Sequence, residues 1–340
     1  MASPKTVQSP PKEQKSLSEI FNGYANETTG LFPGLKGRLL IMDMSEQRLY
    51  GSFDLDEAAT HLTQETALTY INHSPTTYEL LKDKTRTSCA LYDAARDLHI
   101  IFINDLFDQT LPEEKLLRRM LHLLDHELGH LAIPDGYYYK NDTPEELMGE
   151  CIADAYALIR HYQRYGTEVE CADKYVSPFS RAQSLIFDGN GSHFSTFVLD
   201  EIIRRRNAID FEALSPQQTT DAAWQFAKLY APSLEKVGEL IEEFSSVKEA
   251  WEKNHTAGVQ ALIDKTLETD DYAVFRTGNA YLRKFIQGPV TFKDDPPQFS
   301  REYLKEVSKK LQEREFHFAH ADMPKLRATP KEWRALGLAL

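Results

Sequence analysis

The chain has 340 residues, of which 41% are hydrophobic and 27% are charged, and its formal net charge at pH 7 is −13. These proportions exclude collagen-like, low-complexity and disulfide-knotted proteins, and the negative charge disfavours binding to nucleic-acid phosphates. No run approaches the ~18 apolar residues that a membrane-spanning helix needs. We therefore expect neither a nucleic-acid partner nor a membrane partner.

The cysteines and the first residues bear on where the protein folds. Cys89, Cys151 and Cys171 are few and odd in number, which favours a reducing compartment and no disulfide framework. The opening sequence MASPKTVQSPPKEQKS lacks the apolar core of a Sec signal peptide. We expect a cytoplasmic protein, or one exported as an effector without a Sec signal peptide.

The N-terminal part is predicted to contain both strands and helices. Residues 1–17 are polar, rich in proline and without periodicity, which predicts a disordered tail. The sequence then indicates a strand within 35–44 and a helix over 56–71. Two short apolar runs, 87–92 and 98–103, predict a β-hairpin or adjacent strands.

Two helices with clear start signals follow. Thr110 to Glu113 forms a capping box with a proline in the first turn, and apolar residues then recur at helical spacing as far as Leu131. A second capping box begins at Thr143 and is followed by proline. Its helix is predicted to end near residue 165, because Gly166 is a typical helix stop.

The remainder is predicted to be mainly helical. A third helix is expected from about residue 192 to 206, followed by a linker or long loop over 211–220. Helical patterns then recur at 221–231, 233–253, 257–267 and 300–314. The predicted organisation is a disordered tail over 1–17, a catalytic region over 18–210 and a mainly helical C-terminal region over 211–340.

The first of the capped helices contains the sequence HELGH. His126 and His130 are four residues apart, so both imidazoles share one helix face and can bind the same zinc ion. Glu127 lies between them and can reach a water bound to the metal as a general base. The alternative is a pair of surface or core histidines without a metal.

The second capped helix supplies two carboxylates on one face. Glu150 and Asp154 are also four apart, and a catalytic zinc needs three protein ligands and one open position. This spacing favours Glu150 as the third ligand and Asp154 as a hydrogen-bond acceptor for a ligand histidine. The alternative is a solvated acidic pair near a helix N-terminus, which the helix dipole favours.

Together, HELGH and the downstream GECIAD resemble the gluzincin zinc metallopeptidases, which carry H-E-x-x-H followed by E-x-x-x-D or E-x-x-A-D. The resemblance covers about residues 98–165. It implies zinc on His126, His130 and Glu150, with Glu127 as the base and Asp154 bonded to a ligand histidine. It also implies an α+β fold with a zincin-like core, in which a small sheet containing 98–103 lies beside the active-site helix and the glutamate-bearing helix.

Related zinc peptidase groups share part of this motif. The metzincins require glycine at position 133 and histidine at 136, where this chain has Ile133 and Gly136, and they are therefore excluded. HELGH is also similar to the motif of repressor-cleaving cytosolic peptidases and of lethal-factor-like toxins, and these groups stay open.

Two further side chains are candidates for stabilising the oxyanion of amide hydrolysis. His193 follows a glycine-rich turn that opens the third helix. Tyr138 lies with two other tyrosines in the loop between the capped helices. For each, packing or surface exposure is the alternative.

The predicted function is that of a zinc-dependent endopeptidase acting on a protein or peptide substrate, with a restricted target. Two alternatives stay open. One is a zinc amidohydrolase acting on a non-peptide amide, with the same ligands in a narrower pocket. The other is a metal-stabilised binding protein without catalytic activity, which would need the ligands but not Glu127.

Overall fold

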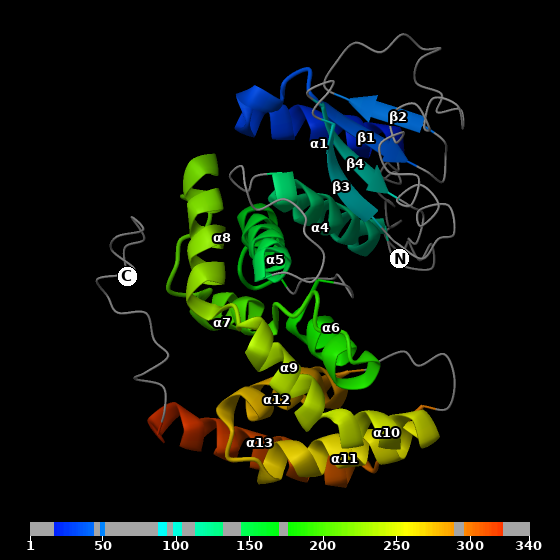
Figure 1. The fold of residues 1–340 in the computed structure, drawn as a ribbon. Helices are drawn as coiled ribbons and strands as arrows, with labels where there is room; N and C mark the ends of the chain where they lie inside the picture. Colours follow the sequence, from blue (N-terminus) through cyan, green and yellow to red (C-terminus); the bar gives the residue numbers. More distant parts are fainter. Residues whose placement is uncertain are drawn as a thin grey trace, which may run out of the picture. The chain divides into compact units, whose positions relative to one another are not determined.

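The computed structural model describes residues 17–43, 48–51, 88–93, 98–103, 113–131, 144–169, 176–288 and 296–321. The chain divides into two units, 1–117 and 118–340 (Figure 1). The predicted helix over 56–71, the loop containing Tyr138 and nearly all of the predicted tail lie outside the described residues. The structure combines many helices with one small sheet, which places it in the α+β class.

The first unit contains a four-stranded sheet with the order β2-β1-β4-β3. The central strands β1 (Leu39–Asp43) and β4 (Leu98–Ile103) run parallel. The outer strands β2 (Arg48–Gly51) and β3 (Ser88–Asp93) each run antiparallel to their neighbour. The predicted pairing of the runs near 87–92 and 98–103 is confirmed, and the strand expected within 35–44 is confirmed over a shorter span.

The two central strands are buried without alternation. Leu39 to Met42 and Ile100 to Ile103 are at most 1% exposed, as expected for strands that are covered on both faces. Helix α1 (Leu17–Leu31) packs against β1 and β2 and leads into the 3-10 turn η1 (Pro33–Leu35). Helix α4 (Glu113–Leu131) begins in this unit and continues into the second.

The second unit is helical throughout its described residues. After α4 it contains α5 (Pro144–Tyr165), α6 (Pro178–Gln183), the π-helical turn η3 (Ser184–Asp188), α7 (Thr196–Arg205), α8 (Pro216–Tyr230), α9 (Leu234–Glu243), α10 (Ser245–Lys253), α11 (His255–Glu268), α12 (Tyr272–Gln287) and α13 (Arg301–Ala321). Helices α10 to α13 pack in succession at one end of this unit (Figure 1). Among the described residues, no helix is sufficiently long and apolar to cross a membrane.

Helix α5 lies at the centre of the second unit. Residues 149–162 are all buried, and α7 and α8 pack against this helix. The predicted end of α5 is confirmed: Gly166 has a φ of 79° and its amide bonds the Tyr162 carbonyl, the left-handed geometry that glycine adopts without strain. Buried on all sides, α5 holds its polar side chains in an apolar environment.

The structure differs from the sequence prediction at several places in this unit. The predicted linker over 211–220 is wrong in its second half, because Ser215 forms a capping box with Gln218 and α8 starts at Pro216. The helix expected over 233–253 is two helices that meet at Phe244. None of the four predicted helical patterns covers α12. The boundary expected at residue 210 falls inside this unit, where α8 packs against α5 and α7.

A buried ion network joins α7, α12 and α13. Asp200 of α7 is 1% exposed and accepts from Arg276 at 3.0 Å and Arg283 at 2.6 Å, both on α12. Arg204 lies 3.3 Å from the same carboxylate and donates to Glu315 of α13. Burial works against the charge on Asp200, but the three arginines hold its pKa well below the usual range.

Replacing this carboxylate with an amide tests the network. Asp200→Asn removes the buried counter-charge that three arginines share, so we expect the free energy of unfolding at pH 7 to fall by about 3 to 5 kcal/mol. The folded-state pKa lies below the unfolded value of ~3.9, so the wild-type advantage is complete at neutral pH and declines below pH ~4. Urea titrations on either side of that pH measure both effects.

The matched control is Asp264→Asn, which changes an exposed carboxylate on α11 that accepts from Gln260. We expect little change in stability for this variant. Equal losses in the two variants, or a loss in Asp200→Asn that persists at acid pH, would contradict the role given to the network.

Candidate metal centre

The site is built where α4 and α5 come into backbone contact. A Cβ on Gly129 would lie 2.7 Å from the Ala153 Cα and 3.1 Å from its carbonyl oxygen, closer than real Cβ atoms approach, so only glycine fits here. One turn earlier on α4, the buried Asp125 accepts two bonds from Arg164 of α5, one of them at 3.0 Å. These two contacts fix the pairing of the helices.

Three side chains, of types that commonly bind metals in proteins, come together where α4 and α5 pack against each other. His126 Nε2 and His130 Nε2 lie 3.2 Å apart on α4. The Glu150 carboxylate of α5 faces both, with Oε2 3.6 Å from His126 Nε2 and Oε1 3.5 Å from His130 Nε2. One donor atom from each of the three residues lies within 4.8 Å of the others, so this group can hold a metal ion.

Asp154 contacts His126 on the side of the imidazole ring that lies away from His130. Its Oδ1 lies 2.7 Å from His126 Nδ1, the ring nitrogen that faces away from His130. Arg181 of α6 donates to both oxygens of the carboxylate at 2.8 Å, and the Ser195 hydroxyl donates to Oδ2. Burial works against the charge on Asp154, but Arg181 and His126 keep its pKa far below the usual range. Asp154 is therefore an ionised carboxylate with no exposed surface.

The two histidines differ in their affinity for a proton. Burial disfavours the charged form of His126, but the nearby carboxylates, Asp154 first, raise its pKa to about 9. Burial lowers the pKa of His130. His126 Nδ1 thus faces Asp154, and its Nε2 lies 3.2 Å from His130 Nε2. A divalent cation bound by the two Nε2 atoms would displace any proton shared between them.

Glu150 has a second imidazole neighbour. His193 Nδ1 lies 2.7 Å from Glu150 Oε2, and the His193 side chain is 45% exposed whereas that of Glu150 is 11% exposed. Burial works against the charge on Glu150, but His130 and His193 lower its pKa well below the usual range. The structure therefore brings His193 to the group of metal-binding side chains, in contact with the carboxylate.

Glu127 is buried on α4 between the two histidines in sequence. Its charge raises the pKa of His126 and acts on His130, so it lies within electrostatic reach of both. Tyr138 lies outside the described residues. His122, one turn before His126, is buried and bonds the Val176 carbonyl, and so it packs rather than joining the site.

Sequence reasoning did not find three residues that hold the site in place: Asp125, Arg181 and Ser195. A partner for Asp154 was expected on physical grounds, because an unpaired buried carboxylate is costly. Nothing in the sequence singled out Arg181, although Ser177, Pro178 and Ser180 form the capping box that starts its helix. Its side chain comes 27 residues after Asp154, beyond the reach of helical periodicity.

Cys151, next to Glu150, is not one of the three residues whose donor atoms converge. Its Sγ lies 4.0 Å from the Phe194 carbonyl oxygen, and it is a free thiol without exposed surface. Burial raises the pKa of this thiol well above its usual value. Cys151 is therefore a packing residue.

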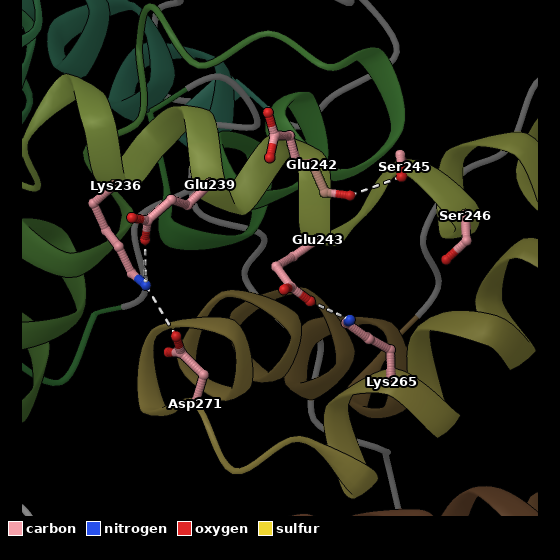
Figure 2. Close-up of a pocket in the computed structure, with 8 residues that line it drawn as sticks. All are labelled: Lys236, Glu239, Glu242, Glu243, Ser245, Ser246, Lys265 and Asp271. Atoms are coloured by element: carbon pink, nitrogen blue, oxygen red, sulfur yellow. Dashed lines mark hydrogen bonds and ion pairs between the residues drawn. The ribbon is translucent and has the colours of Figure 1, made fainter.

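A separate hollow of about 410 Å³ lies among α9, α10, α11 and the start of α12. Both of its lysines are already paired: Lys236 bonds Glu239 and Asp271, and Lys265 bonds Glu243 (Figure 2). None of the site residues lines it. This hollow has no part in the chemistry of the metal-binding group.

No protein-family model, curated protein sequence or solved structure matches this chain. The functional argument therefore rests on the side chains and their geometry.

The contact between α4 and α5 predicts that a glycine-to-alanine substitution in a helix is destabilising, which is the opposite of the usual effect. Glycine to alanine in a helix interior normally stabilises by about 0.5 to 1 kcal/mol. Gly129→Ala instead forces Cβ into the Ala153 backbone, so we expect a destabilisation of about 1 to 3 kcal/mol and weaker Zn²⁺ binding. Thermal unfolding and Zn²⁺ competition with a chelating dye measure the two effects.

Gly238→Ala is the control, because Gly238 is an exposed residue of α9 with no atom within 4 Å of an added Cβ. It should be neutral or stabilising. If Gly129→Ala behaved in the same way, the close approach of the helices would not constrain the site.

The pairing of Asp154 with Arg181 yields a second prediction. Arg181→Met keeps much of the side-chain volume but leaves a buried carboxylate without its strongest partner, so we expect the free energy of unfolding to fall by about 3 to 5 kcal/mol. Adding Asp154→Asn removes the orphaned charge and should recover part of the loss. A double-mutant cycle by urea unfolding measures the coupling, and strictly additive losses would show that the two side chains do not interact.

Proposed function

We propose that this chain is a zinc-dependent endopeptidase with a zincin-like catalytic core. The observation that carries the proposal is the convergence of His126, His130 and Glu150, with one donor atom from each within 4.8 Å of the others. Two imidazoles and one carboxylate are a donor set of catalytic zinc sites in hydrolases. The GECIAD segment supplies this carboxylate from the neighbouring helix, as in the gluzincins that the sequence resembles.

The surrounding residues fit zinc. Ligand histidines usually donate their second ring N–H to a carboxylate, and Asp154 lies 2.7 Å from His126 Nδ1. All three donor side chains are largely buried, which strengthens electrostatic interactions with a cation. Among the described residues the group has three members, and three protein ligands with an open position are typical of catalytic rather than structural zinc.

Each residue then has a distinct part in the hydrolysis. When bound, zinc acidifies water and polarises the carbonyl of the scissile bond. Glu127 accepts a proton from the attacking water as its oxygen bonds to the carbonyl carbon. Glu127 then transfers that proton to the amine nitrogen as the C–N bond breaks. Asp154 holds His126 in the orientation that directs Nε2 toward the site.

The position of Glu127 favours an enzyme over a binding protein. A structural zinc site needs ligands but no base, whereas this chain places a buried glutamate next to the first ligand. The substrate class that we propose is a protein or peptide. The expected cytoplasmic folding favours a restricted protein target over broad digestion.

Glu127→Gln separates catalysis from metal binding. The amide keeps the shape of the side chain but cannot accept the proton, so we expect unchanged zinc content and a loss of turnover of about 10²- to 10⁴-fold. The measurements are metal analysis of the purified full chain and N-terminal labelling of a cell proteome incubated with wild type or variant. New N-termini should appear with the wild type alone.

His126→Ala is the companion variant and should lose zinc itself. Full activity in Glu127→Gln would reject the mechanism. Zinc binding without any new N-termini would reject the peptidase proposal in favour of an amidohydrolase acting on a non-peptide amide or of a catalytically silent binding protein.

A further inference from the structure

His193 contacts the metal-binding group of His126, His130 and Glu150 through one ring nitrogen. Its Nδ1 lies 2.7 Å from Glu150 Oε2, while the nearest imidazole contact of Glu150 Oε1 is His130 Nε2 at 3.5 Å. The two oxygens of Glu150 thus face different partners. His193 is not one of the three residues whose donor atoms converge, and its contact is with the Glu150 carboxylate.

The turn that carries His193 is fixed on both sides. Gly189 has a φ of 69°, and the Asn190 side chain accepts from the backbone and hydroxyl of Ser192. A Cβ on Gly191 would lie 2.2 Å from Val237 of α9, so the turn packs closely on that helix. Directly after His193, Phe194 is fully buried and the Ser195 hydroxyl bonds Asp154. The backbone of His193 is therefore held in place relative to α5.

The contact with Glu150 also determines what the ring can do. A neutral imidazole has one N–H donor and one acceptor nitrogen. Because Nδ1 lies against Glu150, Nε2 is the ring nitrogen that is left for other contacts. The oxyanion-donor role that the sequence suggested for His193 needs a proton on Nε2 and stays a prediction.

We propose that His193 is a positioning residue, which donates Nδ1–H to Glu150 Oε2 and so holds the carboxylate in the orientation that faces His126 and His130. The inference rests on the proposed metal site but not on the reaction that the site carries out. Glu150 has a flexible side chain, and fixing it in advance removes an ordering cost from metal binding. Partners of metal ligands typically change metal affinity by 10- to 100-fold when removed.

Three substitutions at this position distinguish the two ring nitrogens. His193→Asn places an amide N–H at the δ position, where Nδ1 is, and keeps the donor to Glu150. His193→Gln places its amide at the ε position, where Nε2 is. His193→Ala removes both. The probe is Zn²⁺ competition with a chelating dye on the full chain, together with the visible absorption spectrum after Co²⁺ substitution.

We expect His193→Ala to weaken Zn²⁺ binding by 10- to 100-fold and to shift the Co²⁺ bands. His193→Asn should recover most of the affinity and the wild-type spectrum, and His193→Gln should not. His317→Ala, which removes an exposed histidine of α13, is the matched control and should leave both readouts unchanged. Circular dichroism and thermal unfolding check that each variant is folded.

Unchanged affinity in His193→Ala would overturn the proposal. Recovery by glutamine instead of asparagine would also overturn it, because the acting nitrogen would then be Nε2. An equal loss of Zn²⁺ affinity in all three variants would show that His193 contributes only through packing. These outcomes are independent of the peptidase test: a wild type that binds zinc and cleaves proteins can still fail here, and a wild type that binds zinc without cleaving can still pass.

Discussion

An ionised carboxylate without solvent is the constraint around which this site is organised. Asp154 has no exposed surface, so its charge must be balanced inside the protein. Arg181 binds both of its oxygens, and His126 meets one of them from the opposite helix. The Asp154 carboxylate on α5 is therefore in contact with side chains from α4 and α6. The orientation of His126 and the packing of α6 thus both depend on the buried charge of Asp154.

The second constraint is steric. Helix α4 presents its histidines to α5 at a place where the backbones touch, and only the missing side chain of Gly129 permits this approach. The segment from 177 to 195 then closes the other side of α5, with Arg181 and Ser195 on Asp154 and His193 on Glu150. Glu150 and Asp154 are therefore each held from two directions, which limits their rotamers before any ion binds.

How much of the structure could be predicted from the sequence depends on how far apart in the chain the interacting residues lie. Helical spacing placed His126 and His130 on one face, and capping signals located the start and end of α5, because both depend on residues within one or two turns. The partners of the buried charges depend on tertiary contacts. Arg181 reaches Asp154 from another helix, and Arg276 reaches Asp200 across 76 residues of chain.

The burial of α5 has a dynamic consequence. Every residue from 149 to 162 is buried, and the flanking helices cover the backbone amides of this stretch. Such amides exchange with deuterium only when the surrounding unit opens as a whole, so they report global rather than local opening. The helix that carries Glu150 and Asp154 is then among the slowest-exchanging segments of the chain, and its protection provides a direct gauge of the stability of the entire second unit.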